Sequence, residues 1–325
     1  MKSIFTHSTK LLIVLLLSFF SFPTITFSQI GPGTAPVIDP VGGFKIDGTL
    51  SATTTIGDWL DGSGSGGYVL SNSGVPLNSG NTYHLTDAYN TSDDIFGGGE
   101  KYDDNPNSWN WVVGSANDKT DMNNAFIHLS TDSSGNVWIA FAADRLNNNG
   151  NSYMDFEFLQ NTMTKTATGF STITTTGGRT VGDFLLTVYF DNGTAKFNIE
   201  RWELISNGKW GYVSYSTPTN TVYAAGNTAA TSIPFTAFGT NQYEQNTFIE
   251  SAVNLTEVLG AIDPCASLKI KTIFVKSKTS TAPSASIKDF FEPLAVSNLT
   301  LGSADAGDDD FVCDGGSYKL QGTAV

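Results

Sequence analysis

Residues 118–160 read DKTDMNNAFIHLSTDSSGNVWIAFAADRLNNNGNSYMDFEFLQ, and apolar and polar side chains alternate along them in three runs. The first run covers residues 125–129, the second 137–144 and the third 153–158, with a polar turn between successive runs. A repeat of two residues is typical of β-strands, because successive side chains of a strand point to opposite faces. The stretch therefore predicts three consecutive antiparallel strands, adjacent in one sheet.

The alternation also assigns side chains to the two faces of these strands. Ile139 and Phe141 lie on the apolar face, so we expect both to be buried in the core. Tyr153, Asp155 and Glu157 lie together on the other face of the third strand. In an antiparallel sheet one face packs on the core, and the other could meet a ligand.

Composition extends the prediction of β-structure to the whole chain. The 325 residues include 33 glycines and 12% aromatic residues, and helix-favouring runs are few. Polar turns at 191–194 and 206–209 predict successive hairpins. We expect an all-β fold, a two-layer antiparallel β-sandwich of jelly-roll or concanavalin-like type over residues 57–296.

The segments around the central strands are assigned from their periodicity and turn residues. Residues 29–56, rich in proline and glycine, are expected to form an N-terminal segment with one edge strand near 44–46. Residues 218–238 lack a clean period and are predicted to be a surface excursion. Residues 268–278 form a strand whose four lysines indicate a solvated edge, and 286–291 form the last strand of the sandwich.

The N-terminus has the pattern of a secretory signal peptide. Lys2 and Lys10 precede an apolar run at 11–22, and Thr26-Phe27-Ser28 suits a signal peptidase. We therefore expect residues 1–28 to be removed and the protein to be secreted or held at the cell surface. No later apolar stretch is longer, which predicts no transmembrane segment. Loss of the two lysines reduces 17 basic residues to 15 against 31 acidic ones, a formal charge of −16 that disfavours nucleic acid as a partner.

Residues 91–121 combine aromatic side chains with carboxylate and amide groups. Tyr102, Trp109 and Trp111 stand among these polar groups. Exposed aromatic rings in such surroundings suit sugars, whose ring faces stack and whose hydroxyls form hydrogen bonds. The alternative is that Trp109 and Trp111 share one strand face and close an end of the core.

The same region offers four candidate metal ligands, Asp103, Asp104, Asp118 and Asp121. Calcium prefers carboxylate oxygens, so these residues could hold a structural calcium ion. The alternative is that Asx turns stabilise the loop without a metal. His84 and His128 are isolated in the sequence, which disfavours a transition metal.

Arg145 follows Asp144 at the end of the second predicted strand. We expect the two residues to form an ion pair or to brace residues 147–150, and the alternative is a ligand-binding arginine on the rim of a site. Cys265 and Cys313 could form a disulfide in an oxidising compartment.

Six short motifs follow one another along the chain: DIFGGG at 94–99, Asp118-Lys119 with Asp121, FAADRLNNNG at 141–150, GDFL at 182–185, ESAVNL at 250–255 and KDF at 288–290. Together they resemble a family of secreted bacterial β-sandwich domains found N-terminal to Ig-like or PKD-like repeats in large surface adhesins. The resemblance covers about residues 57–296 and implies adhesion without catalytic residues. Glu157 departs from the pattern, because relatives carry an aromatic side chain there.

The tail at 303–325, SADAGDDDFVCDGGSYKLQGTAV, resembles the opening of a PKD-like repeat in surface adhesins of gliding or surface-attached Bacteroidetes. This resemblance implies that residues 297–325 are a linker and the truncated start of such a repeat, followed by further repeats of the same polypeptide. It also implies that Cys313 pairs with a later cysteine.

Asp155 and Glu157 are the strongest hint of catalysis, because carboxylates two residues apart on a strand lie about 7 Å from each other, within the span that glycosidases use. A laminarinase-like pattern has a carboxylate at three alternating positions, and the first is Tyr153 here. Two acids on a solvated face are the simpler interpretation, so no enzyme is predicted.

We therefore expect a non-catalytic extracellular adhesion or carbohydrate-binding domain at the N-terminal end of a large cell-surface protein, with a glycan or cell-surface ligand as partner. The alternatives are a structural cap of a repeat stalk and a secreted glycoside hydrolase or lyase of jelly-roll type. The ligand-binding residues under the first hypothesis are Tyr102, Trp109, Trp111, Arg145, Tyr153, Asp155 and Glu157.

Overall fold

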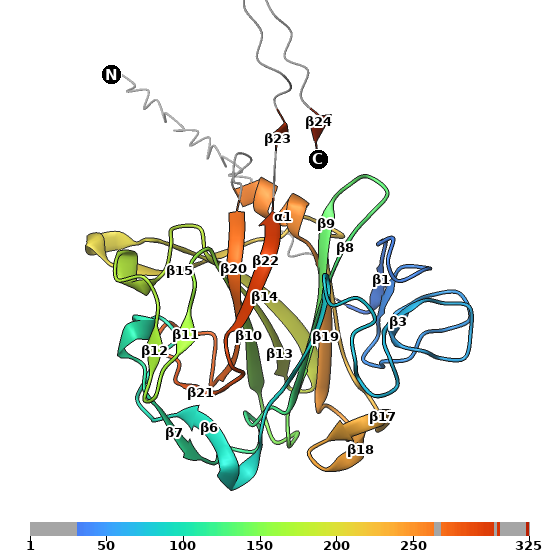
Figure 1. Cartoon of the computed structure of the whole chain (residues 1–325), viewed down its shortest axis with the longest axis horizontal. Helices are drawn as coiled ribbons and strands as arrows, with labels where there is room; N and C mark the ends of the chain where they lie inside the picture. Colours follow the sequence, from blue (N-terminus) through green and yellow to red (C-terminus); the bar gives the residue numbers. More distant parts are fainter. Residues whose placement is uncertain (1–30, 263–267, 302–303, 306–322, 325) are drawn as a thin grey trace, which may run out of the picture.

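Two antiparallel β-sheets face each other in this protein (Figure 1). The computed structural model describes residues 31–262, 268–301, 304–305 and 323–324. The smaller sheet has five strands in the order β16-β19-β9-β8-β5. The larger has nine, in the order β15-β14-β13-β10-β20-β21-β6-β7, with β22 also paired to β20. The predicted all-β, two-layer antiparallel sandwich is confirmed.

The strands of the smaller sheet are β5 (Thr82–Thr86), β8 (Asn124–Thr131), β9 (Val137–Asp144), β16 (Val222–Gly226) and β19 (Phe248–Asn254). Those of the larger sheet are β6 (Asp93–Phe96), β7 (Trp111–Gly114), β10 (Ser152–Leu159), β13 (Phe184–Asp191), β14 (Thr194–Leu204), β15 (Trp210–Tyr215), β20 (Leu268–Lys278), β21 (Ile287–Phe290) and β22 (Leu294–Leu301). The helix α1 (Leu255–Ile262) follows β19, and the short 3-10 turns are η1 (Asn90–Ser92), η2 (Pro106–Ser108), η3 (Thr176–Gly178) and η4 (Ser206–Gly208).

The facing sides of the two sheets form the central core. Ile139 and Phe141 of β9 lie there and are fully buried, as the alternation predicts. Phe141 packs on Phe156 of β10 across the interface, with ring centroids 4.6 Å apart. Burial of one such side chain stabilises the fold by roughly 1.5–3 kcal/mol.

The third predicted strand lies in the other sheet, so the prediction of three adjacent strands was wrong. β8 and β9 pair as expected, but β10 pairs with β13 and β20 in the larger sheet. Residues 145–151 carry the chain from one sheet to the other. Alternation is the same in either sheet, so it cannot distinguish a hairpin from a crossover.

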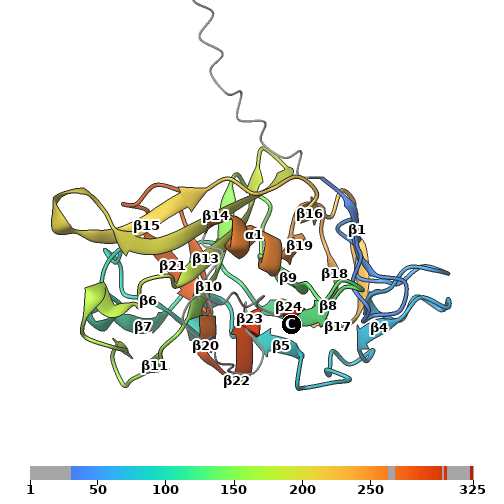
Figure 2. The same cartoon turned by 90° about the horizontal axis from the view of Figure 1, so that it is seen from above.

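The outer face of the smaller sheet is buried as well. The N-terminal strands β1 (Gly33–Ala35), β2 (Phe44–Ile46), β3 (Asp58–Leu60) and β4 (Tyr68–Leu70) cover it, together with β17 (Thr231–Ala237) and β18 (Thr240–Tyr243). Figures 1 and 2 show this layer beside β8, β9 and β19. Trp59 packs on Phe44 and Phe126 in a second core. The segment before residue 57 therefore contributes more than the single edge strand that we expected.

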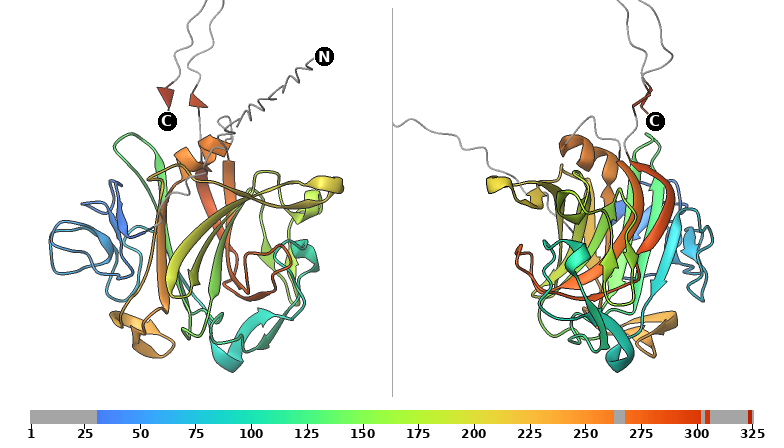
Figure 3. Two further views of the ribbon diagram at one scale, coloured as in Figure 1. Left: turned by 180° about the vertical axis from the view of Figure 1, so that it is seen from behind. Right: turned by 60° about the vertical axis from the view of Figure 1, so that its left-hand side comes forward.

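A third core covers part of the outer face of the larger sheet. β7, the loop that contains η2, and the short strands β11 (Thr164–Lys165) and β12 (Phe170–Ser171) lie on that side (Figure 3). Trp109 packs there on Phe274 and Phe170, with ring centroids 6.2 and 6.1 Å away. This third layer encloses the face of β10 that was expected to meet a ligand.

Three expectations about other segments were also wrong. Residues 218–238 contain β16 and β17, whose small and alternating side chains pack on their neighbours. β20 is an interior strand, so Lys276 and Lys278 are buried, whereas Lys269 and Lys271 are exposed. β22 follows β21, so residues 286–291 are not the last strand.

The predicted hairpin between β13 and β14 is confirmed. Asn192 and Gly193 both have positive φ, which a tight two-residue turn of this kind requires.

Several predictions fall outside the described residues. These are the signal peptide at 1–28, Cys265 and Cys313, and the repeat at 303–325 apart from the paired β23 (Ala304–Asp305) and β24 (Thr323–Ala324). Across the described part of the chain, none of the helices is both long and apolar enough to cross a membrane.

Candidate functional site

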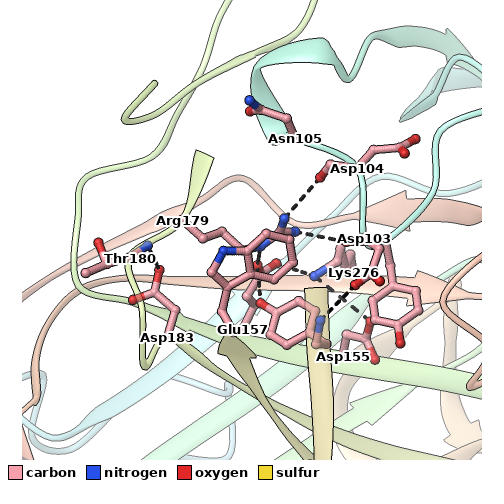
Figure 4. Close-up of polar contacts among 12 residues, drawn as sticks. Asp103, Asp104, Asn105, Asp155, Glu157, Arg179, Thr180, Asp183 and Lys276 are labelled. Atoms are coloured by element: carbon pink, nitrogen blue, oxygen red, sulfur yellow. Dashed lines mark hydrogen bonds and ion pairs between the residues drawn. The ribbon is translucent and has the colours of Figure 1, made fainter. Parts of the chain in front are cut away.

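The outer face of the larger sheet carries a buried charge network, which we define as Asp155, Glu157, Arg179, Glu200, Lys276 and Lys278. Its three carboxylates and three cations balance, and none of the six residues is more than 3% exposed. The carboxylates come from β10 and β14, two of the cations come from β20, and Arg179 comes from the loop after η3. Figure 4 shows most of these side chains converging beneath the loop that contains Asp103 and Asp104.

Glu157 is the centre of one half of this network. Its Oε1 forms a salt bridge with the Nε of Arg179 and accepts a 2.6 Å hydrogen bond from the hydroxyl of Tyr212, while Oε2 pairs with Lys276. Burial alone would raise the pKa of Glu157, but attraction to Arg179 and Lys276 outweighs it and lowers the pKa to about 2. Glu157 is therefore ionised and fully partnered.

Arg179 is held by backbone and aromatic groups. Its Nη1 and Nη2 donate to the carbonyls of Asp104 and Tyr102, each at 3.0 Å. Its guanidinium carbon lies 4.6 to 5.2 Å from the ring centroids of Trp202, Tyr212 and Trp109. Cation–π contacts of this kind strengthen when water is excluded.

The loop that carries Arg179 fits tightly against its neighbours. Gly178 has a φ of +84°, and a Cβ at this position would lie 2.2 Å from Oδ1 of Asn105. The carboxylate of Asp183 then accepts from the backbone N–H of Thr180 at 2.8 Å and from that of Gln160 at 2.9 Å. A glycine and a capping aspartate thus fix where Arg179 enters the network.

Asp155 and Lys278 form the other half of the network. Lys278 Nζ lies 2.9 Å from Oδ1 of Asp155, which also accepts a 2.7 Å hydrogen bond from Thr187. Lys278 lies 4.0 Å from the ring centroid of Tyr102 and 3.8 Å from Glu200. Burial, with a further contribution from Asp155, raises the pKa of Glu200 despite the attraction of Lys278.

The structure places most of the predicted ligand-binding residues in the interior. Tyr102 and Trp109 are buried and cover the charge network, so the interpretation of exposed stacking rings was wrong for them. Asp155 and Glu157 are buried with them, because the third layer covers their face. Trp111 is half-buried beneath Lys165, whose Nζ lies 4.3 Å from its ring centroid.

Arg145 is a buried brace. Its Nη1 donates to the carbonyl of Gly150 at 2.8 Å and its Nε to that of Asn246 at 2.9 Å, and its guanidinium packs over Phe190. Asp144 instead accepts hydrogen bonds from the backbone N–H groups of Asn123 and Asn124. The prediction of a brace is confirmed for Arg145. The carboxylate of Asp144 instead binds the backbone at the start of β8. Arg145 also lines a cleft of 370 Å³ beside Tyr243.

A second cleft lies where β15 leaves the edge of the larger sheet. β15 pairs with β14 from Ile199 to Leu204, and a cleft of 450 Å³ follows the earlier part of β14. Tyr189 and Tyr215 line this cleft. Its other lining residues are Thr194, Ala195, Lys196, Phe197, Asn198, Ile199, Ser216 and Thr217. Tyr153, the remaining predicted ligand residue, is half-buried and stacks on Tyr189 with ring centroids 4.9 Å apart.

The four predicted metal ligands do not form one site. Asp103 accepts from the backbone N–H of Tyr212, and Asp104 accepts from that of Lys101, both beside the charge network. Asp121 instead lies near Asp93 and Asp289, with Asp118 exposed close by. Closeness in sequence was misleading because β7 lies between the two pairs along the chain.

The sequence did not identify Arg179, Glu200 or the buried role of Lys276. A weak signal was available for Arg179, because an arginine directly after Gly177 and Gly178 indicates a close backbone approach. Glu200 and Lys276 appear as ordinary polar positions of alternating strands. No protein-family model, curated protein or solved structure matches this chain.

Proposed function

We propose that this protein is a non-catalytic extracellular adhesion domain that binds a glycan. The observation that carries the proposal is the 450 Å³ cleft lined by Tyr189 and Tyr215 at the edge of the larger sheet. Tyrosine offers a flat apolar ring and a polar hydroxyl, which suit the ring face and the hydroxyls of a sugar.

The polar groups of the cleft support a carbohydrate over an apolar ligand. Thr194, Ser216 and Thr217 supply hydroxyls, and Asn198 supplies an amide that can both donate and accept. Lys196 adds a solvent-exposed ammonium group, which is paired with Asp191. Tyr153 supports the ring of Tyr189 from beside it. A neutral or mildly acidic glycan fits this set of groups.

The buried charge network supports the non-catalytic part of the proposal. A glycosidase needs an accessible acid whose pKa is raised, so that it carries a proton at neutral pH. Glu157 is fully buried in two ion pairs, and its pKa is lowered. Asp155 is buried beside it and paired with Lys278. These carboxylates are arranged to hold the third layer on the sheet.

The cellular setting of the proposal comes from the sequence. Residues 1–28 have the pattern of a signal peptide, and residues 303–325 resemble the start of a PKD-like repeat. An adhesion domain at the outer end of a repeat stalk fits both features.

A glycan array tests the proposal. The chain from residue 29 onward should bind at least one class of glycan, and Tyr189→Ala should abolish that binding while the protein stays folded. Tyr68→Ala is the matched control, because Tyr68 is 39% exposed on β4 of the N-terminal layer. Absence of binding to any glycan would favour the structural cap, and turnover of a polysaccharide by the purified wild-type protein would favour a hydrolase or lyase.

A further inference from the structure

Four aspartates gather where the two sheets meet, and we call them the aspartate cluster: Asp87, Asp93, Asp121 and Asp289. Asp87 follows β5 of the smaller sheet, and Asp121 precedes β8 of the same sheet. Asp93 begins β6 and Asp289 lies on β21, both in the larger sheet. The cluster therefore spans the interface between the two layers of the sandwich.

Three members of the cluster present oxygens to one point. One carboxylate oxygen from each of Asp87, Asp93 and Asp289 lies within 4.8 Å of the other two. Oxygens bound to a single calcium ion at 2.3–2.6 Å are at most about 5 Å apart, so the three aspartates are spaced as ligands of one ion.

The burial of the Asp93 carboxylate is a second observation, beyond the clustering of acidic residues, that points to a bound cation. Asp93 is fully buried, and within the described part of the chain neither of its oxygens has a hydrogen-bond partner. One oxygen of Asp87 and one of Asp121 are also buried without a partner. Buried carboxylate oxygens are strongly unfavourable unless a cation or a donor compensates them. The two oxygens of Asp289 accept from the backbone N–H groups of Met122 and Phe290, which orient the side chain.

The nearby lysine does not supply the missing charge. Lys165 acts on Asp87 electrostatically, but its ammonium group is paired with Asp94. The carboxylates are thus held together against their mutual repulsion.

We propose that Asp87, Asp93 and Asp289 bind one calcium ion that clamps the two sheets together, with Asp121 completing the negative charge around it. The donor set consists of hard carboxylate oxygens from separate segments, which suits the irregular coordination of calcium. Magnesium requires a nearly ideal octahedron and retains several waters, which fits a buried group of three carboxylates less well. The site is distinct from Asp103 and Asp104, and it does not depend on the proposed glycan cleft.

The clamp would act on the segment between β5 and β6. This segment, residues 88–92, leaves the smaller sheet at Asp87 and enters the larger sheet at Asp93, so both of its ends would be fixed by the same ion. β6 then pairs with β7, and Phe96 of β6 packs on Trp109 in the third core. Loss of the ion is expected to loosen this outer layer first.

Calorimetric titration of calcium into the full chain after chelator treatment tests the proposal, with magnesium as a second ion and thermal melts in parallel. We expect one calcium ion per chain and a rise in melting temperature of about 5–10 °C at a hundredfold excess over the dissociation constant. Asp93→Asn and Asp289→Asn should each weaken calcium binding at least about tenfold, since each removes a charged ligand. Asp61→Asn, at an exposed aspartate after β3, should bind calcium like the wild type.

The behaviour in chelator separates loss of a ligand from loss of the fold. Without calcium, Asp93→Asn should melt no lower than the wild type, because the substitution relieves repulsion within the cluster. The proposal is overturned by absence of calcium binding to the wild type, by tighter binding of magnesium, or by unchanged calcium affinity in both asparagine variants. A clearly lower melting temperature of Asp93→Asn in chelator would also contradict it.

Discussion

Glu157 of β10 and Arg179 of the following loop are 22 residues apart in sequence and form a salt bridge in which both side chains are completely buried. Lys276 of β20, which is 119 residues after Glu157 in the sequence, pairs with the same carboxylate. Three segments that are distant in sequence thus meet at the carboxylate of Glu157. The layer that carries Tyr102 and Trp109 contacts the guanidinium group of Arg179. This explains why an acidic residue occupies the middle of a strand face.

Replacement of Glu157 by glutamine should destabilise the protein severely. The substitution leaves two buried cations without their counter-charge, and breaking a buried ion pair from one side costs about 3–5 kcal/mol. Urea unfolding followed by circular dichroism measures the loss. Asp191→Asn is the matched control, because it breaks the solvent-exposed pair with Lys196 and should change the stability far less than Glu157→Gln does. Equal losses in the two variants would mean that the network does not hold the third layer.

The central core gives a second prediction. Phe141→Ala removes a fully buried ring that packs on Phe156, and we expect the free energy of unfolding to fall by about 3–5 kcal/mol. Val113→Ala, at a residue 65% exposed on β7, should change it by less than about 0.5 kcal/mol. A small loss for Phe141→Ala in a denaturant titration would contradict the assignment of the inner face.

Glu250 and Asp58 form a pair of buried acids. Because of this pair, the free energy of unfolding should fall as the pH rises. Burial raises the pKa of Glu250 from 4.5 to about 8, and burial and then Glu250 raise that of Asp58 well above its ordinary range. The folded state retains protons that the unfolded chain releases, so this contribution is complete below about pH 4.5 and is lost as the pH rises through 8.

The free energy of unfolding should therefore fall between pH 5 and 8, by up to about 1.4 kcal/mol per pH unit for each retained proton. Glu250→Gln should reduce this slope, whereas Glu244→Gln, at an exposed residue, should leave it unchanged. Urea titrations at pH 5, 6.5 and 8 measure the slopes. A slope in Glu250→Gln equal to that of the wild type would show that Glu250 is ionised in the folded state.

The strands were predictable because alternation reports how each side chain is buried. Residues 125–129, 137–144 and 153–158 lie in strands where the alternation indicated them. Pairing was less predictable, as β10 shows, because a strand with the same alternation fits either sheet. β16 was missed because alanine and glycine dominate it, and such residues give little contrast between faces.

The candidate sites were less predictable than the strands. Charged residues that alternate on a strand usually face solvent, and only the third layer, which comes from segments distant in sequence, encloses Glu157 and Lys276. Asp93 and Asp289 are 196 positions apart in the numbering and meet because β6 pairs with β21. Tyr189 gave no signal beyond that of a strand residue, since its cleft depends on where β15 ends.

The proposed glycan cleft is tested most directly by affinity electrophoresis in native gels that contain laminarin, mannan, xylan or chitosan. We predict that the wild-type protein is retarded in at least one of these gels and that Tyr189→Ala migrates there as it does in a gel without polysaccharide, while Tyr68→Ala is retarded like the wild type. Wild-type protein that is unretarded in every gel, or Tyr189→Ala that is retarded as strongly as the wild type, would contradict the assignment of this cleft as a sugar-binding site.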